Sequence, residues 1–206
     1  MKIIVRSLAL ICVLLCGAAC TSTKPAVPVV EQASKKPQST TNPTSLLKLN
    51  PVEQTILTYT GKSTDYVTQG KTGAISEASG ATFIIKIIRD RWIDVTVRPK
   101  DGLPWHLAVG APTSKSIADL VIGKNYGGMR LSNHPDYGEL DFSGDGRGYN
   151  TTSGIFAIHE LEIAPDGTVL RLAVDIFMHG DNMSTSGLMA ALRYHSRVEI
   201  PVQSML

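Results

Sequence analysis

The sequence predicts an all-β domain, built as an antiparallel β-sandwich or a partly closed barrel. Apolar and polar residues alternate with a period of two in several short runs, and β-branched residues are frequent in those runs. No long segment carries apolar residues at helical spacing. The length of 206 residues allows one domain with its own core. We place this β-sandwich domain at residues 51–206.

Several strands are expected in the first half of the domain. They are Thr55–Thr60, Thr82–Arg89, Trp92–Arg98 and Trp105–Val109. The second and third of these flank Asp90-Arg91, which indicates a tight hairpin. Ile117–Ile122 fits either a strand or a helical turn.

The last third has the clearest pattern. Ile155–Ile163 alternates, Pro165-Asp166-Gly167 follows, and Val169–Phe177 alternates again. Proline presets one backbone dihedral and glycine accepts positive φ, so the tripeptide predicts a turn between two strands. Leu188–Tyr194 is the next expected strand.

The first nineteen residues are typical of a secretory signal peptide. Lys2 and Arg6 give a short positive region, Ser7–Leu15 is apolar, and residues 17–19 are small. A transmembrane helix needs about 20 apolar residues, which is more than this run provides.

Gly17-Ala18-Ala19-Cys20 resembles the lipobox of bacterial lipoproteins, although that pattern usually has an aliphatic residue at the position of Gly17. Cys12 lies inside the apolar run, and Cys16 follows the bulky Leu15. The resemblance therefore implies cleavage before Cys20 and a lipid, such as palmitate, on that cysteine. Thr21, in place of Asp, implies the outer membrane, with the periplasmic or surface side left open.

Residues 20–50 are expected to be the lipidated cysteine and a flexible linker. The segment is rich in Pro, Ser, Thr and Lys, and it shows no sustained period. A flexible chain of about 30 residues has an r.m.s. span of roughly 30 Å. The domain would therefore stand off the membrane.

Charge argues against nucleic acid as a partner. Loss of residues 1–19 removes Lys2 and Arg6 and no acid, which leaves 18 basic and 18 acidic residues. No basic face stands out. The expected contact with the membrane is therefore the N-terminal lipid. No cysteine follows Cys20, so the domain depends on its core.

The segment Asp141–Asn150 carries glycines at three alternate positions, 144, 146 and 148. A calcium loop is one interpretation, but Thr152 stands where the EF-hand pattern requires Glu. Phosphate binding is another, but the loop has no lysine and no strand–loop–helix context. We favour a structural loop in which Arg147 turns inward and pairs with a carboxylate such as Asp175.

Asp175, His179 and Asp181 form a second polar group. On an extended strand Asp175 and His179 would lie about 13 Å apart, too far to share a metal ion. No HExxH or Gly-x-Ser-x-Gly motif occurs. We expect no metal, cofactor or catalytic residue. The candidates for a structural or ligand-binding loop are Asp145, Arg147, Asn150, Asp175 and His179.

Four aromatic residues could line a sugar-binding face: Trp92, Trp105, Tyr126 and Tyr137. For the two tryptophans we favour a place in the core, since the chain has few large aromatic residues.

Several segments resemble a β-rich domain that recurs in exported bacterial proteins. They are Tyr59–Gly70, Gly144–Asn150, Gly154–Glu160, Leu172–His179, Gly187 and Ala191–Tyr194. The pattern runs approximately Gly-x-Gly-Arg-Gly-Cys-Asn, Gly-x-Phe-x-Val, Asp-Phe-x-x-His-Cys and Gly-x-Ile-Arg-Tyr. The resemblance implies a fold and no particular reaction. Tyr149 and Gly180 occupy the two cysteine positions, which implies that residues 149 and 180 lie close in space.

We therefore expect a lipid-anchored envelope protein whose non-catalytic β-domain binds or protects an envelope protein or glycan. Two alternatives stay open. One is an envelope hydrolase acting on sugar or peptide, and the other is an architectural subunit of an envelope assembly.

Overall fold

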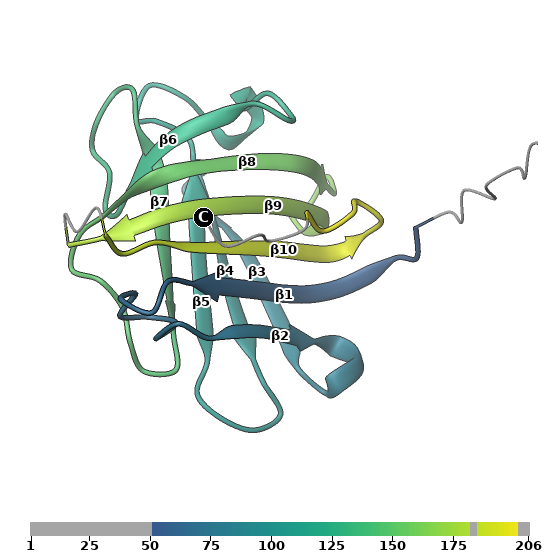
Figure 1. The fold of residues 1–206 in the computed structure, drawn as a ribbon. Helices are drawn as coiled ribbons and strands as arrows, with labels where there is room; N and C mark the ends of the chain where they lie inside the picture. Colours follow the sequence, from purple (N-terminus) through teal and green to yellow (C-terminus); the bar gives the residue numbers. More distant parts are fainter. Residues whose placement is uncertain (1–50, 182–184, 202–206) are drawn as a thin grey trace, which may run out of the picture. The chain divides into compact units, whose positions relative to one another are not determined.

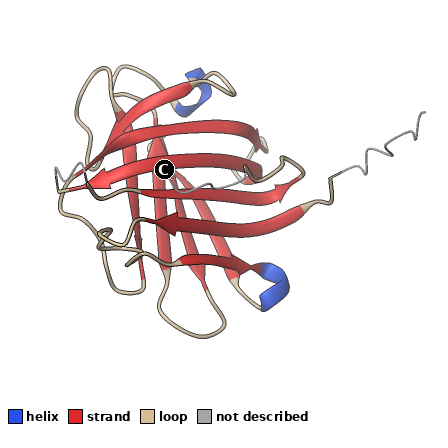
Figure 2. Ribbon diagram, viewed as in Figure 1, coloured by secondary structure: helices blue, strands red, loops and turns tan. Residues whose placement is uncertain are grey.

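The computed structural model describes residues 51–181 and 185–201. The predicted signal peptide, the lipidation site Cys20 and the predicted linker lie outside the described residues. The described chain forms ten β-strands and two short 3-10 helices (Figure 2). Within it, no helix is long and apolar enough to cross a membrane. The predicted all-β class is confirmed.

The strands alternate with turns and short loops along the chain. In order, they are β1 Gln54–Gly61, β2 Thr72–Ser76, β3 Thr82–Ile88, β4 Trp92–Arg98, β5 Trp105–Gly110, β6 Asn125–Met129, β7 Gly138–Gly144, β8 Thr152–Ile163, β9 Val169–Gly180 and β10 Leu188–Ser196. The helices are η1 Glu77–Ser79 and η2 Ile117–Asp119.

All ten strands belong to one sheet, in the order β2-β1-β10-β9-β8-β6-β7-β5-β4-β3. Neighbouring strands are antiparallel, except that β6 and β7 pair in parallel. The sheet curls on itself, so that β3, β4, β5 and β7 lie behind β1, β2, β8, β9 and β10 and cross them steeply (Figure 1). The result is a half-barrel, which agrees with the predicted sandwich or partly closed barrel.

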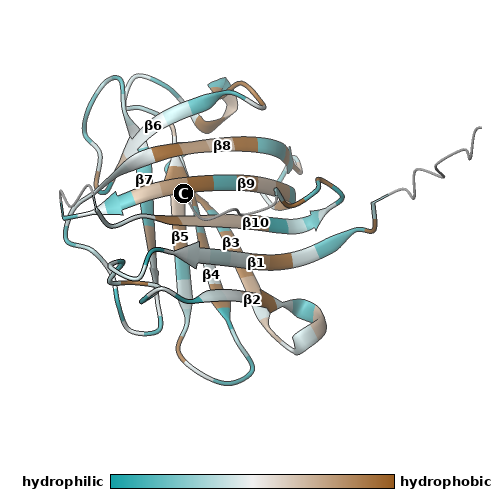
Figure 3. Ribbon diagram, viewed as in Figure 1, coloured by the Kyte–Doolittle hydropathy of each residue, from teal (hydrophilic) through white to brown (hydrophobic). Residues whose placement is uncertain are grey.

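The core lies between these two groups of strands. Alternation along β4 turns Ile93, Val95 and Val97 inward, and all three are almost fully buried. Phe142 of β7 and Phe156 of β8 are buried in the same cluster. Figure 3 shows hydrophobic segments on strands of both groups. Each large apolar side chain buried in this way contributes about 1.5–3 kcal/mol.

The predicted strands are confirmed, with small shifts at their ends. The turn of the first hairpin lies at Arg89 and Asp90, one residue earlier than expected, and both have positive φ (53° and 55°). Residues 117–119 form a helical turn. The turn at Pro165-Asp166-Gly167 is present, with φ of +85° at Gly167.

Three strands, β2, β6 and β7, were not expected from the sequence. β7 includes the first four residues of the segment Asp141–Asn150, so only its second half is a loop. Trp105 is buried as expected and stacks on Tyr59 with ring centroids 4.1 Å apart, whereas Trp92 is only partly buried.

Candidate functional site

The glycine-rich segment forms a tight turn at the end of β7. Gly144 and Arg147 exchange two backbone hydrogen bonds, each 2.9 Å long. Between them, Asp145 and Gly146 both have positive φ (52° and 77°), which is easy for glycine and tolerated by aspartate. This turn fixes where the side chains of Asp145 and Arg147 lie.

Arg147 pairs with Asp145, and the predicted pair between Arg147 and Asp175 is wrong. Nη1 of Arg147 donates to Oδ2 of Asp145 at 2.9 Å, and the Arg147 side chain is 25% exposed. Asp145 lies two residues away on the same turn, so the arginine needs no distant partner. Asp175 belongs to the middle of β9, where it pairs with Arg193 and His159 instead.

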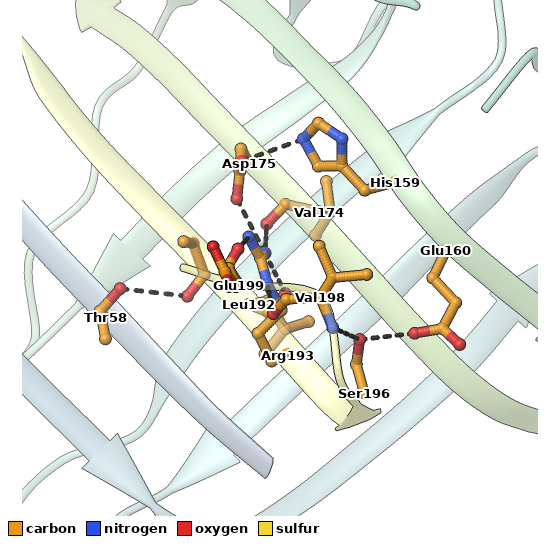
Figure 4. A network of polar contacts seen from close by, with 11 residues as sticks. Thr58, His159, Glu160, Val174, Asp175, Leu192, Arg193, Ser196, Val198 and Glu199 are labelled. Carbon is orange, nitrogen blue, oxygen red and sulfur yellow. Dashed lines mark hydrogen bonds and ion pairs between the residues drawn. The ribbon is translucent and has the colours of Figure 1, made fainter. Parts of the chain in front are cut away.

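Arg193 of β10 is the buried arginine of this domain (Figure 4). Its side chain is 0% exposed, and Nη1 donates to Oδ1 of Asp175 at 2.8 Å. Nε and Nη2 donate to the carbonyls of Val198 and Glu199, at 3.0 and 2.8 Å. The segment after β10 therefore covers the guanidinium. The second oxygen of Asp175 lies 2.9 Å from Nε2 of His159.

The sequence contains a signal for a buried, structural Arg193, although this residue was not among the site candidates. Arg193 is the single charged residue in the run Leu188–Tyr194. A lone arginine among inward-facing apolar residues needs a carboxylate partner, and Asp175 on the neighbouring strand supplies it. The network holds β9, β10 and the following segment together, so we assign it a structural role.

Tyr149 ties the other end of the loop to β9 and to the segment after β1. A β-carbon added to Gly180 would lie 2.0 Å from the Tyr149 ring, so the two residues are in direct contact. The Tyr149 hydroxyl donates to Oδ2 of the buried Asp65 at 2.6 Å and accepts from the Tyr66 N–H at 2.8 Å. Burial, followed by the bond to Asp65, raises the pKa of Tyr149 to about 12. The predicted proximity of residues 149 and 180 is confirmed.

The remaining candidates separate into two places. The backbone N–H of Asn150 donates to Asp181, and its carbonyl accepts from Arg130, so Asn150 stays with the loop. His179 lies on β9, where its Nδ1 donates to the Ser186 carbonyl. Asp145, Arg147 and Asn150 are thus neighbours, whereas Asp175 and His179 belong to other contacts.

A cleft of about 420 Å³ opens beside the glycine turn, and we call it the loop cleft. Its polar lining consists of His106, Arg130, Asp141, Ser143, Arg147 and Asn150. A volume of this size lies within the range of small-molecule sites. Four of these residues were not among the site candidates: His106, Arg130, Asp141 and Ser143. They come from β5, from β7 and from the segment that follows β6.

Asp141 has the most unusual environment in the loop cleft. Its Oδ2 accepts from Nε of Arg130 at 3.1 Å. Its Oδ1 is buried, and it makes no hydrogen bond of normal geometry in the described part of the chain, although the Phe142 N–H lies near the carboxyl group. Burial raises the pKa of Asp141, and Arg130 opposes that shift.

Two further hollows adjoin the loop cleft. One, of about 450 Å³, shares Asp141 and is lined by Trp92, Asn133 and Glu139 among others; we call it the Trp92 hollow. The other, of about 220 Å³, shares Leu103 and Arg147 with the cleft. Glu139 accepts hydrogen bonds from the backbone N–H groups of residues 131 and 132, at 2.9 and 3.0 Å. These bonds hold the loop between β6 and β7 in place.

Among the described residues, the loop cleft contains groups that can bind a ligand, but no nucleophile that is hydrogen-bonded to a base. His106 and Ser143 face each other across β5 and β7, yet Nδ1 of His106 contacts Oγ1 of Thr96 at 3.2 Å. Neither Ser143 nor Asp141 is hydrogen-bonded to His106 among the described residues. Across residues 51–181 and 185–201, no three His, Cys, Asp or Glu side chains gather in a way that could hold a metal ion.

Comparisons of the chain with known protein families, curated proteins and solved structures found no match.

Proposed function

We propose that this chain is an exported lipoprotein of the bacterial envelope, anchored to the outer membrane by lipid on Cys20, whose β-domain binds a ligand in the loop cleft without catalysing a reaction. The signal-peptide pattern of residues 1–19 and the lipobox-like residues 17–20 support the anchoring. One observation carries the binding function: Arg130 and Arg147, each held by an ion pair to a partly exposed aspartate, line one open cleft together with Asp141.

Oδ1 of Asp141 is shielded from solvent, but the side chain as a whole is 26% exposed and lines the cleft. A ligand donor can therefore reach the carboxylate through that exposed part. Asp141 and Asp145 hold Arg130 and Arg147 in place before any ligand arrives. Such preorganisation reduces the entropy lost on binding.

The hydrolase alternative has less support. Carboxylate-based hydrolysis needs two carboxyl groups whose pKa values are pushed apart. Burial raises the pKa of both Glu139 and Asp141. Glu139 is buried, and both of its oxygens already accept backbone N–H groups, which favours a structural role over general-acid or general-base work.

The architectural alternative is favoured by a different surface. Ile155, Phe177 and Met189 are cross-strand neighbours on β8, β9 and β10, and none is fully buried. The Tyr137 ring lies against Gly127, the partner of Ile155 on β6. A row of this kind would suit an apolar surface on another envelope protein. Replacing Ile155 with Lys should then release that protein while ligand binding in the loop cleft continues.

A single reporter cysteine can test whether the loop cleft is occupied in cells. Residues 51–206 contain no cysteine, so Asn150→Cys would place one thiol at the exposed rim of the cleft. We expect a thiol-reactive probe to modify this position more slowly in intact envelopes than in the purified full chain. Lys86→Cys, at an exposed site on β3 outside the three hollows, is the matched control. Equal rates at residue 150 in both preparations would refute the binding function.

A further inference from the structure

The loop cleft and the Trp92 hollow lie in series along β7. Glu139, Asp141 and Ser143 are spaced by two residues, so they share one face of the strand. At about 3.3 Å per residue, this row is roughly 13 Å long. Asp141 stands between the two hollows and lines both. The surface is therefore suited to an extended ligand that passes over Asp141.

The charges around this surface are already compensated. Arg130 pairs with Asp141, Arg147 pairs with Asp145, and the carboxylate of Glu139 accepts two backbone N–H groups. The guanidinium carbon of Arg91 also lies over the Trp92 ring, 5.6 Å from its centroid, so three arginines face three carboxylates. An anionic ligand would meet no excess positive charge here, whereas a neutral ligand needs no counter-ion.

The available groups match hydroxyls better than any other neutral group. The partly exposed carboxylates of Asp141 and Asp145 accept hydrogen bonds, and the guanidinium groups of Arg130 and Arg147 can donate further N–H bonds beside those of their ion pairs. A hydroxyl both donates and accepts, so neighbouring hydroxyls can satisfy a carboxylate and a guanidinium that lie side by side. Leu103, which is 53% exposed, and the partly exposed Trp92 add apolar surface at the two ends.

We propose that the ligand is a neutral glycan chain of at least two sugar units, which lies along β7 across the loop cleft and the Trp92 hollow. This inference rests on the function proposed above and names its ligand class. One unit donates a hydroxyl hydrogen bond to the exposed part of the Asp141 carboxylate and accepts from Arg130 or Arg147. The next unit packs its apolar face against the part of the Trp92 ring that lines the hollow, beside the Arg91 guanidinium that lies over the ring.

The test is calorimetric titration of the full chain, in detergent, with neutral β-linked oligosaccharides of one to six units. We expect affinity to rise from one unit to two or three and then to level off. The affinity should change little with salt, because no net charge is neutralised. An acidic oligosaccharide and an acidic peptide, measured in the same way, are the competing ligand classes.

Two variants test the two ends of the site one at a time. Asp141→Asn keeps an oxygen for Arg130 and removes the charge of the carboxylate acceptor, so all oligosaccharides should bind about tenfold or more weakly. Trp92→Ala should weaken the longer oligosaccharides and leave the single sugar unchanged. Lys86→Ala, outside the hollows, should bind like the wild type. If Asp141→Asn fails to fold, the dependence on length and the Trp92 variant still decide the matter.

The outcomes distinguish this inference from the function on which it rests. Binding of only the acidic oligosaccharide or the peptide overturns the neutral glycan. Protection of residue 150 in envelopes, without oligosaccharide binding, also overturns it, while the proposed binding function stands. No protection and no binding overturn both.

Discussion

The ring of Tyr149 lies directly against the α-carbon of Gly180, and a β-carbon built there would meet three ring carbons at 2.0 to 2.2 Å. Tyr149 follows the glycine turn, and Gly180 ends β9. Tyr149 is 3% exposed, and its hydroxyl reaches Asp65 beyond β1. One side chain therefore joins three segments that are distant in the sequence.

Gly180→Ala should destabilise the domain by about 1–3 kcal/mol, because the added methyl group overlaps the Tyr149 ring. The backbone at residue 180 is outside the left-handed region, so the effect comes from packing. Urea unfolding measures it. In a Tyr149→Ala background the space is open, and the same substitution should cost much less. An equal cost in both backgrounds would contradict the packing explanation.

Tyr149 should make stability depend on pH in the alkaline range. Its pKa is raised from 10.0 to about 12, first by burial and then by the bond to Asp65, so the folded state favours the neutral phenol. The stabilisation is complete below pH 10 and is lost as the pH rises towards 12. Burial also raises the pKa of Tyr59, so ultraviolet titration should show a late step near pH 12 for Tyr149 beside the delayed ionisation of Tyr59. Tyr149→Phe should remove that late step, and its persistence would assign the raised pKa to another tyrosine.

Alternation predicted the long strands because their buried residues are large and β-branched. β8 and β9 each run for 12 residues with this pattern, and both were found. β6, Asn125–Met129, has two glycines in five residues, and β2 is similarly short. In β7 only Leu140 and Phe142 supply large buried apolar side chains between flanking glycines. Neighbouring strands hold these weak segments in the sheet, and a local pattern does not contain that information.

The same limit explains the error at Arg147. The sequence indicated an arginine that needs a partner and an aspartate on β9, but not which strand lies beside β9. In the sheet β10 lies beside β9, so Asp175 of β9 pairs with Arg193 of β10 and not with Arg147. The loop cleft was also partly hidden. His106 and Ser143 are brought together by the pairing of β5 with β7, and Arg130 follows β6, which pairs with β7 in parallel. Asp145, Arg147 and Asn150 were found because they share one loop.

The lipid anchor leads to a prediction that does not depend on the fold. Cys20→Ser removes the thiol that would accept the acyl chain, so the chain should remain unacylated and uncleaved. Metabolic labelling with palmitate and the electrophoretic mobility of the precursor measure both effects. Cys12→Ser and Cys16→Ser are matched controls that should retain the label. Labelling of the Cys20→Ser chain would place the lipid on a different cysteine.

Arg193 and Arg147 should differ strongly in their effect on stability. Arg193→Ala leaves Asp175 without its buried partner and removes the donors to Val198 and Glu199, which should cost about 3–5 kcal/mol. Arg147→Ala breaks a partly exposed pair within one turn, and such pairs contribute about 0–1 kcal/mol. Chemical denaturation of both variants makes the comparison.

Arg193→Lys sharpens this test, because lysine keeps the charge but cannot reproduce the forked donors of the guanidinium. Its stability should therefore fall between those of Arg193→Ala and the wild type. Arg147→Ala should instead weaken ligand binding in the loop cleft while the domain stays folded. If Arg147→Ala proved the more destabilising change, the roles of the two arginines would be reversed, and the glycine turn would have to be a structural element after all.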